Sequence, residues 1–126
     1  MSVKWLGDAT RRRQDGAVSF RYRVSGVVVE EESGKPLLDV VVRAYDKDVA
    51  LDDFLGETRT DADGRFSIVF TQVQFQDVFE QRPDLYLELF DASGTRLVAT
   101  TRDTIRRNAG VEERYAIAIP REKLTS

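Results

Sequence analysis

The sequence predicts an all-β fold, namely a seven- to eight-stranded antiparallel Greek-key sandwich with at most one short helix. Short apolar runs alternate with a period of two, and turn residues separate these runs at regular intervals. The length of 126 residues suits a single domain with one core. Hydrophobic residues make up 41% and charged residues 33% of the chain, which is typical of a globular protein.

The first half of the chain contains the predicted strands 22–30, 40–45, 54–59 and 65–70. In the second of these runs, Val40, Val42 and Ala44 share one face. In the fourth run, Phe66 and Phe70 do the same. This alternation is typical of strands that are buried on one side only.

The second half contains the predicted strands 85–90, 95–101 and 114–120. Leu85, Leu87 and Leu89 are expected to point into the core. The segment 74–81 is the one helix candidate.

The domain boundaries follow from these strands. Residues 1–21 are predicted to be an N-terminal arm or tail, 22–120 the sandwich and 121–126 a C-terminal tail. This N-terminal stretch is a tail, a partner-binding arm or an added edge strand over residues 17–23.

Missing residue types exclude several classes of chemistry. The chain has no cysteine and no histidine, which excludes thiol nucleophiles, Ser-His-Asp triads and histidine-bound zinc or iron. A bound metal would therefore have to be a hard cation held by oxygen. The net charge of −3 offers no positive field for nucleic acid.

The sequence also bears on location. No apolar run is long enough to cross a membrane, and the N-terminus has charges where a signal peptide needs an apolar segment. We therefore expect a cytoplasmic protein without membrane insertion. Export by a signal-independent route, or within a larger assembly, stays open.

A family resemblance is carried by the segments "GVVVEEESGKPLLDVVVRAYDKD", "LGETRTDADGRFSIVF" and "PDLYLELFDASG". Together they resemble the transthyretin-like and carboxypeptidase regulatory-like domains over roughly residues 24–119. The resemblance implies an immunoglobulin-like sandwich of the kind that bacterial proteins use as a non-catalytic accessory module. Hydroxyisourate hydrolases and intradiol dioxygenases share this fold but use histidines, so neither activity carries over. We therefore predict that the chain is not an enzyme.

The acidic segment "DKDVALDDFLG" raises a choice between a metal site and a polar loop. It is similar to the calcium loop of C2 domains, and the ligands would be Asp46, Asp48, Asp53 and Asp103. Alternating strand directions place this segment at the same end of the sandwich as Arg82, Arg102, Arg106 and Arg107. Because arginines there would compensate the carboxylates without a metal, we favour a solvated, arginine-paired loop.

A second acidic motif, "TDADG", is interpreted as a hairpin turn. One of its Asp side chains would accept a local backbone N–H, and Gly64 would supply a positive φ. An EF-hand reading fails because Phe66 occupies the position of the required glycine.

These observations predict a non-catalytic protein-interaction or accessory module without a cofactor, whose partner is another protein. The contact residues at the loop end are predicted to be Asp46, Asp48, Asp52, Asp53 and Arg106. A second contact surface is predicted at Trp5, Arg11, Arg12 and Arg13. Three alternatives stay open: a calcium-dependent C2-like binding domain using residues 46–53, an enzyme that uses only carboxylates, and a homo-oligomer formed through an edge strand.

Overall fold

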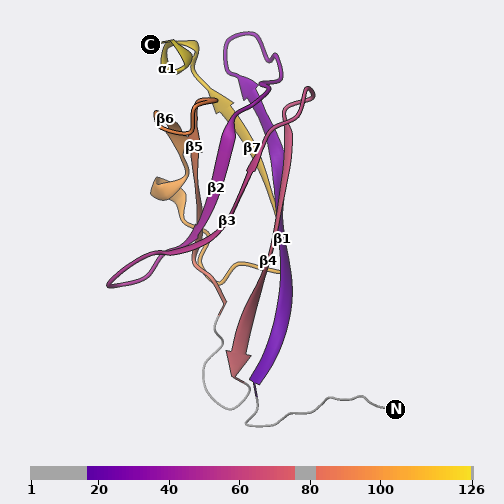
Figure 1. The fold of residues 1–126 in the computed structure, drawn as a ribbon, viewed down its shortest axis with the longest axis vertical. Coiled ribbons are helices and arrows are strands. Elements are labelled where there is room, and N and C mark those ends of the chain that lie inside the picture. Colours follow the sequence, from indigo (N-terminus) through magenta and orange to yellow (C-terminus); the bar gives the residue numbers. More distant parts are fainter. Residues whose placement is uncertain (1–16, 76–81, 126) are drawn as a thin grey trace.

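The computed structural model describes residues 17–75 and 82–125, and these residues form two packed β-sheets (Figure 1). The strands are β1 (Ala17–Glu30), β2 (Val41–Asp46), β3 (Asp53–Arg59), β4 (Arg65–Phe75), β5 (Leu85–Phe90), β6 (Leu97–Thr100) and β7 (Glu112–Ile119). The short helical elements are the 3₁₀ turn η2 (Arg102–Thr104) and the helix α1 (Arg121–Leu124). Sheet A has the strand order β4-β1-β7, and sheet B has the order β3-β2-β5-β6. The predicted all-β sandwich is therefore confirmed.

One strand pair departs from the predicted antiparallel arrangement. β1 and β7 pair in parallel, from Arg23 opposite Glu112 to Glu30 opposite Ile119. The other strand pairs of the described sheets are antiparallel. The reason is geometric: successive strands alternate in direction, so the first and the seventh strand point the same way and must pair in parallel when they are neighbours.

The core lies between the sheets and is built from alternate residues of the strands. Val42 and Leu87 of sheet B are fully buried, and Phe66 of sheet A belongs to the same cluster. Ile117 of β7 is partly buried and packs against this cluster. Each fully buried aliphatic side chain contributes about 1.5–3 kcal/mol to stability. The predicted period-two burial is confirmed by these positions.

β1 and β4 are longer than predicted and extend together past the end of sheet B (Figure 1). Their ladder runs from Ala17 opposite Phe75 to Val27 opposite Arg65. The predicted boundary between arm and sandwich at residue 21 therefore falls inside a strand. The first residues of the predicted helix 74–81 also belong to β4, while residues 76–81 lie outside the described residues. The pairing of β1 with β4 continues in this extension, although sheet B no longer covers the inner face of the two strands.

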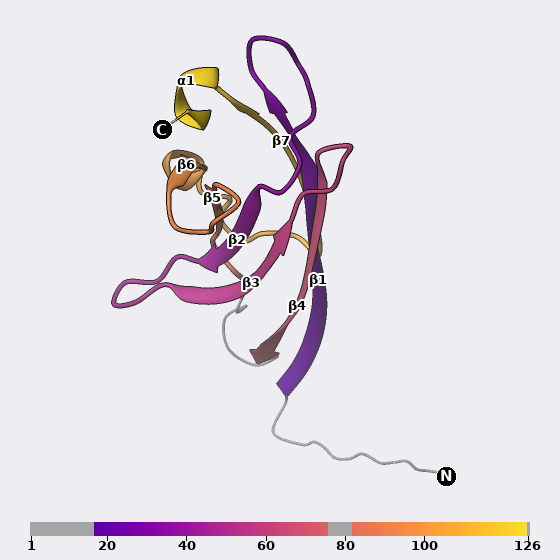
Figure 2. The same ribbon diagram turned by 45° about the horizontal axis from the view of Figure 1, so that its top comes forward.

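The predicted C-terminal tail is docked to the sandwich through α1, next to β6 (Figure 2). The guanidinium group of Arg96 donates hydrogen bonds to the carbonyls of Lys123 at 2.8 Å and Leu124 at 3.3 Å. Arg121 forms an ion pair with Glu30 at 2.9 Å. The bonds from Arg96 satisfy carbonyls at the end of the helix, and the ion pair of Arg121 ties its start to β1.

The turn between β3 and β4 has the predicted geometry. Asp61 accepts the backbone N–H groups of Asp63 and Arg65 through Oδ1, each at 2.9 Å. Gly64 adopts a φ of 75°, which favours glycine. Among the described residues, no helix combines the length and the hydropathy required to span a bilayer.

Candidate functional site

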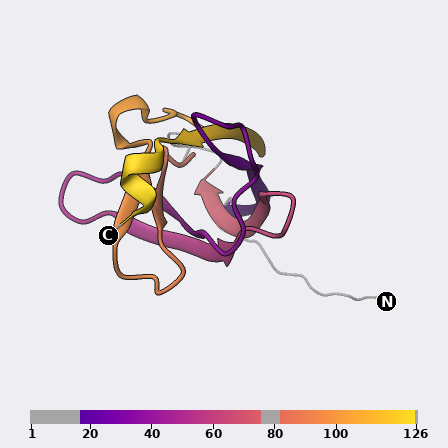
Figure 3. The same ribbon diagram turned by 90° about the horizontal axis from the view of Figure 1, so that it is seen from above.

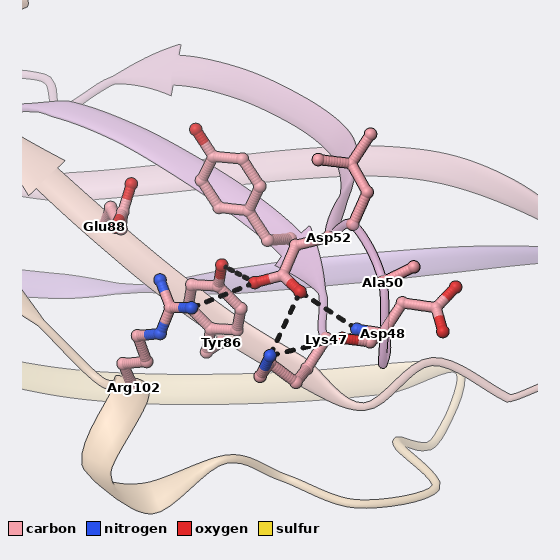
Figure 4. Close-up of a pocket in the computed structure, with 9 residues that line it drawn as sticks. Lys47, Asp48, Ala50, Asp52, Tyr86, Glu88 and Arg102 are labelled. Carbon is pink, nitrogen blue, oxygen red and sulfur yellow. Dashed lines mark hydrogen bonds and ion pairs between the residues drawn. The ribbon is translucent and has the colours of Figure 1, made fainter.

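An open pocket of about 380 Å³ lies where the β2–β3 loop meets the outer face of sheet B (Figure 4). Its lining residues are Tyr45, Lys47, Asp48, Ala50, Leu51, Asp52, Tyr86, Glu88 and Arg102. Strand parity brings these elements together, because the loops after β2 and β6 both lie at the end of the sandwich where β5 begins. The sequence-based placement of the acidic segment and Arg102 at one end is therefore confirmed.

Aromatic side chains form the floor of this region. Tyr45 of β2 and Tyr86 of β5 are cross-strand partners, and their rings stack with centroids 5.3 Å apart. Phe54 of β3 meets Tyr45 edge-on at 5.8 Å. The guanidinium carbon of Arg102 lies 5.1 Å from the centroid of the Tyr86 ring. This row of rings spans neighbouring strands and forms a rigid base for the loop.

Asp52 anchors the loop to that base. Its Oδ2 accepts a 2.5 Å hydrogen bond from the Tyr86 hydroxyl and lies 3.4 Å from Nη2 of Arg102. Its Oδ1 accepts the backbone N–H of Asp48 at 3.0 Å and lies 3.3 Å from Nζ of Lys47. Figure 4 shows these groups converging on the carboxylate from both sides. We call this arrangement the Asp52 clasp.

The clasp shifts the pKa values of its members. The hydrogen bond from Tyr86, followed by the Asp48 N–H and Lys47, lowers the pKa of Asp52 to about 2. Burial and the same hydrogen bond raise the pKa of Tyr86 above its ordinary value. At neutral pH, Asp52 is therefore ionised and Tyr86 keeps its proton. The pair holds the loop through a charge-assisted hydrogen bond.

Two of the four predicted calcium ligands, Asp46 and Asp48, accept hydrogen bonds from backbone N–H groups. Asp46 accepts the backbone N–H of Asp84 at 2.8 Å, and burial raises its pKa. Asp48 accepts the N–H of Val49 at 2.6 Å. Asp53 is the cross-strand partner of Asp46.

Asp103, the remaining predicted ligand, lies exposed in η2. Within residues 17–75 and 82–125, no group of three or more acidic side chains is placed to hold a metal ion. The structure therefore provides no assembled site for the calcium hypothesis.

Contacts within the protein already engage some of the residues that were predicted to bind a partner. Asp52 is enclosed in its clasp, with 14% of its side chain exposed. Arg106 lies over the ring of Tyr115 at 3.8 Å and pairs with Glu113 at 2.9 Å. The second predicted surface, Trp5 with Arg11, Arg12 and Arg13, lies outside the described residues.

The exposed apolar side chains of the loop escaped the sequence reasoning. Val49 is 100% exposed, Leu51 is 78% exposed and Phe54 is 59% exposed. Their signal was the apolar run "VAL" inside an acidic turn, where polar residues are expected. The hydrogen bond between Tyr86 and Asp52 was not foreseen either.

Comparisons with known proteins show the fold. No protein-family model and no curated protein matches this chain. It is similar to a 9R-lipoxygenase from Cyanothece PCC8801 with a TM-score of 0.55 and 21% identity, over 90% of this chain and 18% of the lipoxygenase. The dioxygenase domain of a carbohydrate-binding fusion protein from Streptomyces sp. SirexAA-E has a TM-score of 0.46 and 20% identity, over 79% of each chain. The 3-chlorocatechol 1,2-dioxygenase from Rhodococcus opacus 1CP has a TM-score of 0.47 and 17% identity, over 85% of this chain and 62% of that enzyme.

The lipoxygenase neighbour corrects one prediction. The chain was expected not to be an enzyme, yet the solved structure that it resembles with a TM-score of 0.55 is a lipoxygenase. The chain spans less than a fifth of the lipoxygenase, and at 21% identity this likeness shows a shared fold. No family model or curated protein tests the resemblance to transthyretin-like or carboxypeptidase regulatory-like domains, so that resemblance stays a prediction.

Proposed function

We propose that this chain is an interaction or accessory module of the transthyretin-like type, and that it docks on another protein through the loop tip, residues 48–54. The observation that carries the proposal is the exposure of apolar side chains at the end of an anchored loop. Val49, Leu51 and Phe54 are each more than half exposed. Exposed apolar clusters of this kind are typical of interaction surfaces.

The Asp52 clasp supports a binding role for the tip. A loop that is already held in one conformation loses less entropy when it binds than a free loop does. Lys47 and Arg102 both interact with Asp52, which directly follows the exposed Leu51 in the chain. The clasp therefore presents apolar side chains to a partner from a rigid base.

The likeness to part of a lipoxygenase supports an accessory role. Its fold corresponds to 18% of a lipoxygenase chain, so a sandwich of this shape occurs as a minor part of a larger protein. A partner that supplies an apolar pocket would remove the exposed tip from water. Burial of Val49 and Leu51 would contribute about 1.5–3 kcal/mol each.

The test compares the full chain with a tip variant as bait in an extract of the source cells. V49S/L51S changes only exposed side chains, and L97S on β6 is a matched control because Leu97 is 48% exposed and lies away from the tip. We expect one or more proteins to bind wild type and L97S, and recovery with V49S/L51S to fall by more than about tenfold. Equal recovery by the wild-type chain and V49S/L51S contradicts the proposal.

A further inference from the structure

The outer face of sheet A is basic, although the chain has a net charge of −3. The charged residues that β1, β4 and β7 direct away from the core are Arg21, Arg23, Arg65, Arg114 and Glu112. Arg23 pairs with Glu112 at 3.6 Å. Arg21, Arg65 and Arg114 form no ion pair with any residue that the structure describes. Their positive charges are therefore available to a partner.

A shallow hollow of about 300 Å³ lies within this basic face. Gly26 and the half-exposed Val27 line it, and Arg65 and Arg114 stand at its rim. The register explains the arrangement: Arg65 of β4 is opposite Val27, and Arg114 of β7 is opposite Ser25 on the other side of β1. We call this feature the arginine hollow; its floor is uncharged and its rim is cationic.

The loop tip has the complementary character. Its apolar side chains Val49 and Leu51 are flanked by Asp48 and Asp53, which form no ion pair with other described residues. The nearby cations Lys47 and Arg102 interact with Asp52 instead. An apolar tip with an anionic rim therefore matches an uncharged hollow with a cationic rim.

The two features lie on opposite sides of the sandwich. Figure 3 shows the β2–β3 loop projecting on the side away from β1 and β4. The tip of one molecule therefore does not reach its own hollow. Contacts of this kind between copies are heterologous, so they produce rings or open chains of molecules.

We infer that this chain associates with itself head to tail, the loop tip of one copy seated in the arginine hollow of the next. The inference rests on the proposed role of the tip as a docking element and names a second copy as an occupant. The ion pairs at the rim of the contact are exposed to solvent, so added salt weakens the association.

The experiment measures the mass distribution of the full chain by analytical ultracentrifugation over a range of concentrations and salt. The tip variant V49D/L51D and the hollow variant R65E/R114E each break one half of the contact, so each alone stays monomeric. A mixture of the two variants retains one intact tip and one intact hollow. It forms a dimer and nothing larger, because the mutated surfaces block further growth. L97D, on the exposed face of β6, associates as wild type does.

Circular dichroism and melting curves establish that each variant is folded. Growth of the wild-type mass with concentration, together with the capped dimer in the mixture, supports the inference. A wild-type chain that stays monomeric at every concentration, or a mixture that stays monomeric, overturns it. Neither of these results affects the proposed function, which fails only if V49S/L51S captures partners as well as wild type does.

Discussion

Substitution of Gly26 by alanine tests the close packing of sheet A. A methyl group at this position would collide with the backbone carbonyl of Tyr115 and lie 2.9 Å from carbons of the Phe66 ring. The ring can shift, but the carbonyl belongs to the neighbouring strand β7, so the parallel ladder has to open locally. Overpacking of this kind costs about 1–3 kcal/mol.

The expected change in melting temperature follows from the size of the chain. At about 2.1 cal/mol/K per residue, unfolding of 126 residues has an entropy of about 0.26 kcal/mol/K. G26A should therefore lower the midpoint by about 4–11 °C in a calorimetric or circular-dichroism melt. Gly110 provides the matched control, because a methyl group there meets its nearest atom at 3.4 Å. If G26A melts within about 1 °C of wild type, the tight approach of β1 to Phe66 and β7 is refuted.

Three further predictions concern the core, the clasp and the acidic loop. L87A removes a side chain that is 0% exposed. It should lower the free energy of unfolding, measured by urea titration, by about 2–5 kcal/mol. A loss under about 1 kcal/mol would contradict the central position of Leu87 in the core. The folded-state pKa of Asp52, about 2, is below its unfolded value, so its stabilising effect is present above about pH 4 and is lost as the pH falls toward 2. The difference in melting temperature between wild type and D52N should therefore shrink over that range, and a constant difference would show that Asp52 is not held in its ionised form. Calcium and chelator should give the same melting midpoint, since no group of three or more acidic side chains among the described residues is placed to hold a metal ion. A rise of several degrees with calcium would restore the metal hypothesis.

The strands were predictable because their signal is local. Burial of one face requires apolar residues at every second position, and Val42, Phe66 and Leu87 reveal that period in the sequence alone. The "TDADG" turn was predictable for the same reason, since Asp61 bonds to N–H groups two and four residues away. An added edge strand over residues 17–23 was one of the open alternatives, whereas the extension of β4 from residue 70 to Phe75 was missed.

The site was only partly predictable, because its contacts join residues that are far apart in the chain. Strand parity placed Arg102 at the same end as the acidic loop, and the pairing of Arg102 with Asp52 agrees with that placement. Strand parity does not specify side-chain positions, so it could not indicate which carboxylate Arg102 would pair with. Asp52 reaches Tyr86, whereas Asp46 is held by the backbone N–H of Asp84.

The amino-acid sequence by itself determined the all-β class, most strand positions and the chemistry that is excluded by the absence of cysteine and histidine. Only the tertiary structure decided that β7 pairs in parallel with β1 and that Asp52 is clasped. It also decided that arginines with no ion pair among the described residues gather on the outer face of sheet A, opposite the loop tip. The physical reason is that periodicity reports which face of a strand is buried, whereas neighbours in a sheet are chosen by packing across the whole domain.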